Sequence, residues 1–324
     1  MEIDMNLLEE CTGAASIGIS THIRPDGDAV GSSMALYLYL HRQLPGVEVK
    51  LFLETPPDNF RHLKYLNEID SSFSYNGTFD VFFALDTVAD RMGEAVPYFT
   101  SAKKKINIDH HISNAQGCGD VNVIKPEVGS TAEILYELME EERLDEDIAM
   151  ALYTGMIHDT GIFQYSNTRP ETLQIAAKLM GFGFDFAKII EESFYQKTYL
   201  QNQILGRALT ESIRFMDGRC IFSCINRKMM DFYQVKQGDL DGIVNQLRNT
   251  KGVDCAIFLY ETDLMEYKVS LRSNELVDAS AVASLFGGGG HARAAGCTMK
   301  GSMHDVINRL SREIARQLEE NGPC

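Results

Sequence analysis

The chain has 324 residues, of which 46 are acidic and 30 are basic, and its formal net charge at pH 7 is −16. This surplus of negative charge repels phosphates, which argues against a protein that binds long nucleic acid along a broad basic surface. Any anionic substrate must be held by a local cluster of hydrogen-bond donors, and the length allows two domains that each bury a core.

The start of the chain, MEIDMNLLEECTG, is acidic and contains no basic segment followed by an apolar one, so it does not resemble a secretion signal. No apolar run approaches the roughly 18 residues that a membrane helix needs. The seven cysteines are scattered and form no C-x-x-C pair, which favours reduced thiols. We therefore expect a cytoplasmic protein with no membrane partner.

Short β-rich runs alternate with helical patterns up to about residue 125, which is typical of a doubly wound α/β sheet. The β-rich runs are ASIGIS, VEVKLFL, FDVFFAL and KKINI, and the helical patterns between them are GSSMALYLYLHRQL, FRHLKYL and RMGEAVPYF. Further helical patterns follow, namely STAEILYELMEEE, EDIAMALYTGMIHD and PETLQIAAKLMGFG. The sequence thus predicts an N-terminal domain with a mostly parallel sheet over residues 1–190.

The second half of the chain begins with QKTYLQNQILGRALTESIRF, which has helical periodicity without a strong apolar face. We interpret residues 191–215 as a linker helix for this reason. The later patterns are the strand RCIFSCI, the helix DLDGIVNQLRN, the hairpin-like VDCAIFLYETDLMEYKVSLRS and the amphipathic helix MHDVINRLSREIARQLEE. Residues 216–324 are therefore predicted to form a smaller α/β domain.

Carboxylate and imidazole side chains gather at the carboxyl ends of the predicted strands, where open parallel sheets bind ligands. Along the chain they are His22, Asp26 and Asp28, then Asp86, then Asp109, His110 and His111. A fourth cluster, His158 and Asp159, lies at the end of a predicted helix just before a glycine. These donors suit divalent metal ions, and the number of carboxylates favours Mn²⁺ or Mg²⁺. The glycine between Asp26 and Asp28 lets the backbone turn tightly, so that the two carboxylates can point at different ions.

Each of these clusters also has an ordinary structural explanation. An Asp-x-Asp loop is commonly a turn or a helix N-cap, and Asp28 can cap the helix that begins there. A single aspartate after a strand, such as Asp86, is commonly a turn residue, and a His-His pair commonly lies on the surface. Four such clusters of polar side chains at one edge of a sheet would be an unusual coincidence, so together they favour a metal site.

A glycine run and an arginine in the second half indicate how an anion could be held. The run GGGGH ends at His291, and consecutive glycines allow backbone N–H groups to converge on a phosphate. Arg272 ends a predicted strand in SLRS, and a guanidinium suits bidentate contact with phosphate. The alternatives are a flexible turn and an ordinary surface arginine.

The motifs HIRPDGDAVGS, ALDT, NIDHH and HDTGIF, followed by SLRS and GGGGHARAAG, resemble those of the DHH phosphoesterases with a DHH-associated C-terminal domain. The resemblance covers nearly the whole chain and is specific in order and spacing. Within that family the sequence is most similar to the stand-alone bacterial type that acts as an oligoribonuclease (nanoRNase) and as a 3′-phosphoadenosine 5′-phosphate phosphatase. It implies an active cleft between the two domains that holds two divalent ions, Mn²⁺ or alternatively Mg²⁺.

The resemblance also assigns roles to individual residues. The implied metal ligands are His22 and Asp26 for one ion, Asp28, His110 and Asp159 for the other, and Asp86 as the carboxylate that bridges both. His111 is expected at the reacting phosphate, and Asp109 is expected to orient the histidines as a hydrogen-bond acceptor. His158 is left out of the ligand set. The implied substrate-binding residues are Arg272, Ser273, Gly288, Gly289, Gly290 and His291.

The activity implied by the resemblance is two-metal hydrolysis of short oligoribonucleotides, of two to five nucleotides, to mononucleotides, together with removal of the 3′-phosphate of 3′-phosphoadenosine 5′-phosphate. Two alternatives stay open, namely a phosphodiesterase for cyclic di-AMP or linear dinucleotides and a non-catalytic nucleotide sensor. A long-strand exonuclease of the RecJ type is disfavoured, because the chain is acidic and has no tryptophan. The pyrophosphatases of this superfamily lack the GGGGH ending. The oligomeric state stays open, with a homodimer as one alternative.

Overall fold

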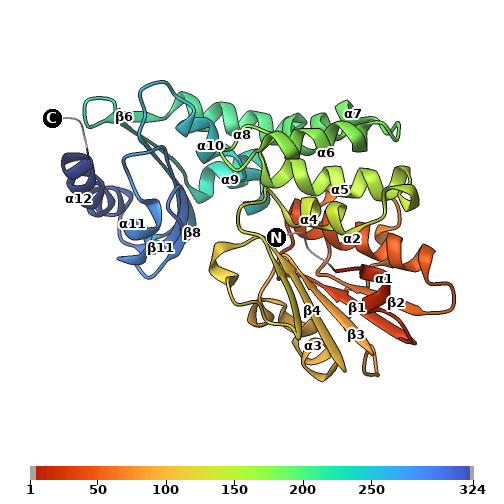
Figure 1. Cartoon of the computed structure of the whole chain (residues 1–324). Helices are drawn as coiled ribbons and strands as arrows, with labels where there is room; N and C mark the ends of the chain where they lie inside the picture. The colour runs from red at the N-terminus through yellow and green to blue at the C-terminus, as the bar shows by residue number, and fades with distance from the viewer. Residues whose placement is uncertain (1–4, 322–324) are drawn as a thin grey trace. The chain divides into compact units, whose positions relative to one another are not determined.

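The computed structural model describes residues 5–321, and residues 1–4 and 322–324 lie outside the described part. The chain divides into two compact units, residues 1–196 and residues 197–324, and each contains its own sheet (Figure 1). No helix within residues 5–321 is both long and apolar enough to span a membrane. The six cysteines in this range are free thiols, and Cys324 lies outside it.

The first unit is built on a five-stranded parallel sheet with the order β2-β1-β3-β4-β5. Its strands are β1 (Ser16–Ser20), β2 (Glu48–Phe52), β3 (Val81–Leu85), β4 (Lys104–Asp109) and β5 (Val121–Ile124). The chain runs outward from β1 to β2 and then returns to β3 on the other side of β1. This reversal of strand order marks the place where open α/β sheets bind ligands. Because all of its strand pairs are parallel, this sheet confirms the predicted parallel α/β sheet.

The helices of the first unit are α1 (Leu7–Glu10), α2 (Gly27–Gln43), α3 (Val96–Ser101), α4 (Thr131–Leu138), α5 (Glu146–Asp159), α6 (Pro170–Met180) and α7 (Phe186–Ile190). Helices α2 and α5 approach each other closely at Gly31, where a Cβ would lie 2.5 Å from the carbonyl oxygen of Ala151. A Cβ on Gly155 of α5 would likewise lie 2.7 Å from Oδ1 of Asp28. These two glycines therefore allow α5 to pack against the start of α2.

Two segments of the first unit differ from the sequence prediction. Residues 60–66, interpreted as helical, contain parts of two 3₁₀ turns at Asp58–Phe60 and Leu66–Glu68. Phe60 and Leu63 are buried, so the apolar spacing reflects the packing of turns. Strand β5 was not predicted, and the reason is that Val123 is its only buried residue, which gives no strong strand pattern.

The second unit is built on a six-stranded mixed sheet with the order β10-β11-β9-β8-β7-β6, in which only the β7–β8 pair is parallel. Its strands are β6 (Ile213–Phe215), β7 (Cys220–Ile225), β8 (Cys255–Asp263), β9 (Glu266–Ser273), β10 (Gly289–His291) and β11 (Ala294–Lys300). Its α-helices are α8 (Tyr199–Thr210), α9 (Arg227–Tyr233), α10 (Ile243–Arg248), α11 (Ala279–Ser284) and α12 (Met303–Asn321).

Both faces of this second sheet are covered, and alternate residues of β8 point into two separate cores. Ile257 belongs to the core formed with α11 and α12, whereas Phe258 belongs to the core formed with α8, α9 and α10. Helix α8 buries Ile204 and Ala208 in that latter core. The segment interpreted as a linker helix thus contains a π-helical turn at Glu191–Tyr195 and then α8, which packs as part of the second unit.

Candidate metal centre

Carboxylate and imidazole groups from four segments meet at the carboxyl edge of the parallel sheet. They come from the loop between β1 and α2 with the first turn of α2, from the residues that follow β3 and β4, and from the last residue of α5. Ligand atoms that lie within 4.8 Å of one another define three groups: His22, Asp26 and Asp86; Asp28, His110 and Asp159; and Asp86, His110 and His111. The structure therefore brings together all six residues that the sequence nominated as metal ligands.

The two aspartates of the first loop have different surroundings. Asp26 is the N-cap of α2, and its carboxylate accepts hydrogen bonds from the N–H groups of Asp28 and Ala29 at 3.2 and 3.1 Å. Asp28 is fully buried and accepts hydrogen bonds from the N–H groups of Thr131 at 2.6 Å and Ala132 at 3.0 Å. The alternative in which Asp28 caps the helix is therefore wrong, because Asp26 is the cap.

Asp86 lies where the ligand groups meet. It follows β3 with a φ of +55°, a left-handed conformation that is uncommon for a residue with a side chain, and its N–H donates to the carbonyl oxygen of Ile108 at 2.9 Å. Its Oδ2 lies 3.6 Å from Nε2 of His22, and its Oδ1 lies 3.5 Å from Nε2 of His110. The two oxygens of one carboxylate thus face two histidines, His22 and His110.

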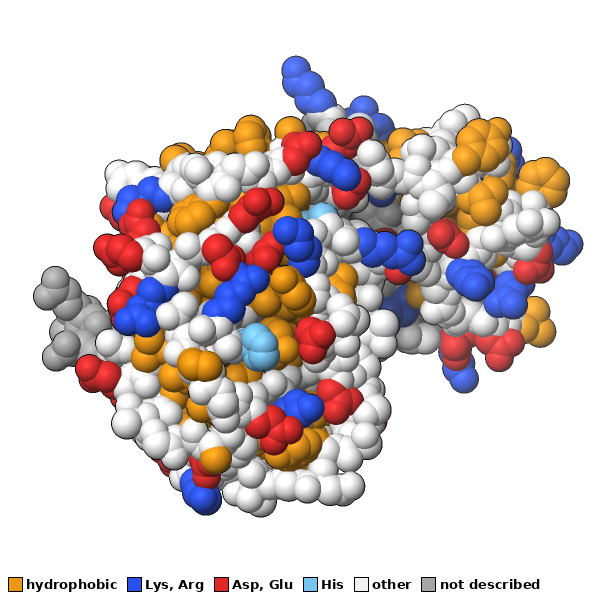
Figure 2. Space-filling view, turned by 90° about the vertical axis from the view of Figure 1, so that its right-hand side faces the viewer, with side chains coloured by type: hydrophobic (Ala, Val, Ile, Leu, Met, Phe, Trp, Pro, Cys, Tyr) orange, Lys and Arg blue, Asp and Glu red, His pale blue; other side chains and the backbone are white. Residues whose placement is uncertain are grey.

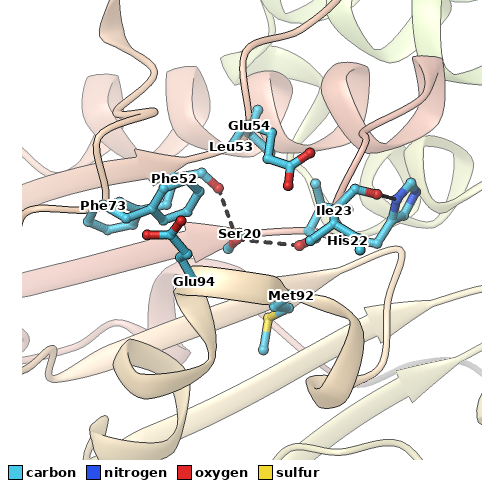
Figure 3. Close-up of a pocket in the computed structure, with 10 residues that line it drawn as sticks. Ser20, His22, Ile23, Phe52, Leu53, Glu54, Phe73, Met92 and Glu94 are labelled. Carbon is cyan, nitrogen blue, oxygen red and sulfur yellow. Dashed lines mark hydrogen bonds between the residues drawn. The ribbon is translucent and has the colours of Figure 1, made fainter.

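The ring orientations of His22 and His110 fit metal binding. Nδ1–H of His22 donates to the carbonyl oxygen of Ile23 at 2.9 Å (Figure 3), and Nδ1–H of His110 donates to that of Val128 at 3.3 Å. A histidine that donates through Nδ1 to a backbone carbonyl presents Nε2 as its ligand atom, which is the usual arrangement around a bound metal. Nε2 of His110 also lies 2.9 Å from Oδ2 of Asp159.

Asp109, at the end of β4, holds the ring of His111. It is fully buried, and its carboxylate accepts hydrogen bonds from Nδ1–H of His111 at 2.8 Å and from the side-chain amide of Asn114 at 2.7 Å. Nδ1 of His111 is thereby engaged, which leaves Nε2 to contact other groups. The His111 side chain is 29% exposed, against 7% for His22 and 12% for His110. His111 is therefore the most accessible of the three imidazoles.

The crowding of acidic groups shifts several pKa values. Burial raises the pKa of Asp28 well above its usual range, and the charges of Asp86 and Asp159 raise it further. Burial also raises the pKa of Asp86 to about 6. Burial acts to lower the pKa values of His22 and His110, but hydrogen bonds to neighbouring aspartates outweigh it and raise both to about 10. The site therefore favours positive charge, which protonated imidazoles or divalent cations can supply.

His158, which the sequence analysis left out of the ligand set, is a packing residue. Its ring centroid lies 5.0 Å from that of Phe60 and 4.5 Å from that of Phe194, and burial lowers its pKa to about 4. A Cβ on Gly27 would lie 2.0 Å from Cγ of this ring. The glycine between the two aspartates is therefore required by the close approach of His158, and not by the backbone turn that the sequence suggested.

A small cavity adjoins His22 (Figure 3). Its volume is about 30 Å³, and its lining includes Thr21 and the carboxylates Glu54 and Glu94. The hydroxyl of Thr21 is buried and has no hydrogen-bond partner among the described residues, which suits one bound water molecule. The cavity is too small for a nucleotide, and its two glutamates repel phosphate, so it is not a substrate site.

Arg272 and His291 share one face of the second sheet. Arg272 is paired with Ala294, which is in turn paired with His291, and directly opposed residues of antiparallel strands point to the same face. Ser273, the next residue of β9, points to the opposite face and is fully buried. Its hydroxyl donates to the carbonyl oxygen of Ala292 at 3.1 Å, so it supports the turn beside His291.

The glycine run differs from the open phosphate-binding loop that the sequence suggested. The N–H groups of Gly287 and Gly288 donate to carbonyl oxygens at the end of α11 at 3.2 and 3.0 Å, so these two groups are already paired. Gly289 and Gly290 form the edge strand β10. Gly290 has a φ of +146°, and a Cβ there would lie 2.4 Å from a carbonyl oxygen of β11. The run is thus a helix C-cap followed by a closely packed edge strand.

Residues at the start of α4 support the ligands, and the sequence analysis did not nominate them. Thr131 donates to two carboxylates of the cluster: its N–H donates to Asp28 and its hydroxyl donates to Asp86. The side chain of Ser130 caps α4, and the fully buried Glu133 pairs with Arg169 at 2.7 Å. The Ser-x-x-Glu spacing of Ser130 and Glu133 is a signal for a helix start that could have located this support.

Two family models match the chain, that of the DHH family N-terminal domain over residues 16–156 and that of the DHHA1 domain over residues 219–320. The chain belongs to the DHH family. A bifunctional oligoribonuclease and PAP phosphatase NrnA from Thermus thermophilus is 30% identical to it, over 98% of this chain and 95% of that protein. A protein of the same name from Bacillus subtilis is 27% identical, over 88% of this chain and 89% of that protein. The crystal structure of an exopolyphosphatase-related protein from Bacteroides fragilis is similar with a TM-score of 0.87 and 25% identity, over 98% of this chain and 96% of that chain.

Proposed function

We propose that this chain, a phosphoesterase of the DHH family, uses two divalent metal ions to hydrolyse short oligoribonucleotides to mononucleotides and to remove the 3′-phosphate of 3′-phosphoadenosine 5′-phosphate. The names of the relatives from Thermus thermophilus and Bacillus subtilis, oligoribonuclease and PAP phosphatase, support these substrates. Mn²⁺ is the proposed ion and Mg²⁺ the alternative, because most of the proposed ligands are carboxylates.

The observation that carries the proposal is the position of Asp86. Its two carboxylate oxygens lie 3.6 and 3.5 Å from the Nε2 atoms of His22 and His110, respectively. We assign Asp86 as the shared ligand, with the remaining ligands supplied by the rest of the two groups. One ion would be held by His22 and Asp26, and the other by Asp28, His110 and Asp159.

Divalent ions held at this edge would activate a water molecule and neutralise the charge that builds on a phosphoryl group during in-line attack. The protein groups then have the tasks of binding and orienting the phosphate. His111, fixed by Asp109, has a free Nε2 and enough exposure to contact a phosphate oxygen. No side chain has to act as a nucleophile, so the site needs neither an activated serine nor an activated cysteine.

The second unit is proposed to bind the nucleotide through Arg272 and His291. Both residues lie on one face of its sheet, with Ala294 of β11 between them. The Arg272 guanidinium donates to Oδ1 of Asn245 at 3.0 Å and to the carbonyl oxygen of Leu271 at 3.0 Å, and a guanidinium has further N–H donors that suit a phosphate. Such a local site is needed in a chain with a net charge of −16. On the face drawn in Figure 2, acidic and basic side chains are interspersed. This distribution supports a short substrate in preference to a long strand.

The test is a substrate panel in Mn²⁺ that contains dinucleotides, pentanucleotides, a long single strand, 3′-phosphoadenosine 5′-phosphate, cyclic di-AMP and pyrophosphate. We expect product from the short RNAs and from the bisphosphate. The matched control is Asp86→Asn, with its fold checked by circular dichroism, which should lose activity on both. Faster release of product from cyclic di-AMP would favour the cyclic dinucleotide phosphodiesterase. Absence of product from every substrate, with Mn²⁺ bound, would favour the nucleotide sensor.

A further inference from the structure

A groove on the second unit lies between α8 and α9, which pack against each other (Figure 1). Its volume is about 450 Å³, which falls in the range of roughly 300–1,000 Å³ that is typical of ligand sites. The residues that line it are Arg207 of α8, Asn226, and Lys228, Met229, Phe232 and Tyr233 of α9. None of them was nominated as a substrate-binding residue.

The groove and Arg272 lie on the same face of the sheet but toward opposite ends of its strands. Strand β7 ends immediately before α9 at Ile225, which is paired with Tyr260 of β8. Arg272 is paired with Ala256 of β8, four residues away, which corresponds to about 13 Å along the strand. Ala256 and Phe258 share a core with residues of α8 and α9, so the helices cover the face to which Arg272 also belongs. The groove is therefore distinct from the Arg272 and His291 pair.

The charged side chains that line the groove are cations. Lys228 is exposed and forms no ion pair within residues 5–321. Arg207 pairs with Glu211 one helical turn along α8, which engages one of its nitrogens and leaves further N–H donors. On α9 itself, Asp231 lies 3.5 Å from Arg227 and pairs with it, and it does not line the groove. A groove with two cations and no carboxylate in an acidic chain is complementary to an anion.

An exposed aromatic ring stands beside these cations. Phe232 is 79% exposed, and its ring centroid lies 5.0 Å from that of Tyr233 at an interplanar angle of 84°. A phenyl ring that is open to solvent next to unpaired positive charge is the combination that binds single-stranded nucleic acid, through base stacking and phosphate contact. Asn226 caps α9 by accepting from the N–H of Met229 at 2.9 Å, and its amide nitrogen remains a donor for a ligand.

We propose that the α8–α9 groove binds one nucleotide of a single-stranded oligoribonucleotide, with the base stacked on Phe232 and the phosphate held by Lys228 and Arg207. This inference rests on the proposed function and extends it to a second binding position on the substrate. A strand of several nucleotides has the length to contact both Arg272 and the groove. A nucleoside bisphosphate that is held at Arg272 is shorter than such a strand, so we expect the groove to add affinity for oligonucleotides and not for the bisphosphate.

The test measures binding without turnover, in full-length protein that carries Asp86→Asn. The probe is a pentaribonucleotide with one 2-aminopurine, whose fluorescence is quenched when the base stacks. We expect Phe232→Ala to weaken binding about tenfold and to reduce the quenching, because stacking on an aromatic residue is worth roughly 1–3 kcal/mol per base. We expect Lys228→Gln to reduce the slope of log Kd against log salt concentration by about 0.7, since one phosphate contact is lost.

Matched controls separate these effects from general damage. Leu264→Ala removes a side chain that is 85% exposed in the β8–β9 turn, and Lys251→Gln removes an exposed charge outside the groove. Both should bind the probe as the parent does. Unchanged pentanucleotide binding in Phe232→Ala and Lys228→Gln would overturn the proposal. A protein partner would then be the favoured ligand of the groove. An equal loss of affinity for 3′-phosphoadenosine 5′-phosphate would also overturn it.

The two proposals can fail separately. Because the binding measurement needs no hydrolysis, it reports on the groove even if the wild-type chain releases no product from RNA. The substrate panel in turn reports on the activity even if the groove variants bind RNA normally.

Discussion

The hydroxyl of Thr131 donates a hydrogen bond to Oδ1 of Asp86 over 3.1 Å. The N–H group of Thr131 donates to Oδ2 of Asp28 over 2.6 Å. One residue at the start of α4 thus fixes two carboxylates that come from different strand ends. Groups that hydrogen-bond to metal ligands set ligand orientation, so Thr131 is a positioning residue for the proposed metal centre.

Thr131→Val keeps the shape and the N–H group of this residue but removes the hydroxyl. Asp86 then loses a hydrogen bond that fixes its rotamer, and we expect Mn²⁺ affinity to fall by about 10- to 100-fold, the usual loss when a partner of a metal ligand is removed. Thr131→Ser, which keeps the hydroxyl, should bind close to normally. Calorimetric titration with Mn²⁺ checks both variants. If Thr131→Val binds Mn²⁺ as tightly as the wild-type protein does, the assignment is contradicted.

Asp86 and Asp109 should differ in the size of their effects. Asp86→Ala removes the proposed shared ligand and should abolish activity together with bound Mn²⁺. Asp109→Ala releases the ring of His111, whose Nδ1 lies 2.8 Å from it, and should lower kcat by about 10- to 100-fold while metal is retained. Metal content and kcat, measured on the same preparations, distinguish the two. Small and equal losses of kcat in the two alanine variants would count against the roles given to both residues.

The clustering of the proposed metal ligands could be predicted from sequence because parallel strands end at one edge. Asp86 follows β3 and His110 follows β4, two runs whose strand character is plain, and the topology of an α/β sheet then brings their side chains together. The same argument fails for Thr131 and Glu133. Thr131 bonds to Asp28, which is 103 residues away in the chain, and Glu133 pairs with Arg169. The Ser-x-x-Glu spacing marks the start of α4, but the partners of these two residues depend on how α4 packs.

The glycines show a second limit of sequence reasoning. The motifs drew attention to Gly27 and to the GGGGH run. In the structure, glycine is needed at these positions for reasons other than those that the sequence suggested. Gly27 is needed because the ring of His158 leaves no room for a Cβ, and Gly290 is needed because β11 lies too close. A glycine in a sequence indicates either an unusual φ or a close approach, and only coordinates distinguish these two causes.

Arg272 and His291 should affect substrate binding without affecting the metal. Both belong to the second unit, whereas every proposed metal ligand belongs to the first. We expect Arg272→Ala and His291→Ala to raise KM for dinucleotides and to leave Mn²⁺ affinity unchanged. Arg272→Lys should recover little, because an ammonium cannot make the bidentate contact of a guanidinium. Loss of bound Mn²⁺ in either alanine variant would contradict this division of roles.

The dependence of activity on strand length is the sharpest test of the proposed substrate class. The chain offers an anion few places to bind, namely the metal centre, the Arg272 and His291 pair and the α8–α9 groove, and its net charge is −16. Nucleotides beyond those places lie against a protein with a large negative net charge, so each added phosphate increases the repulsion. We expect kcat/KM to fall steeply once a strand exceeds about five nucleotides, and to fall less at high salt, where the repulsion is screened over about 10 Å or less. Rates in Mn²⁺ for two-, three-, five- and twenty-four-nucleotide RNAs at low and high salt measure this dependence. A twenty-four-nucleotide strand hydrolysed as fast as a trinucleotide at low salt would contradict it and would favour an exonuclease that acts on long strands.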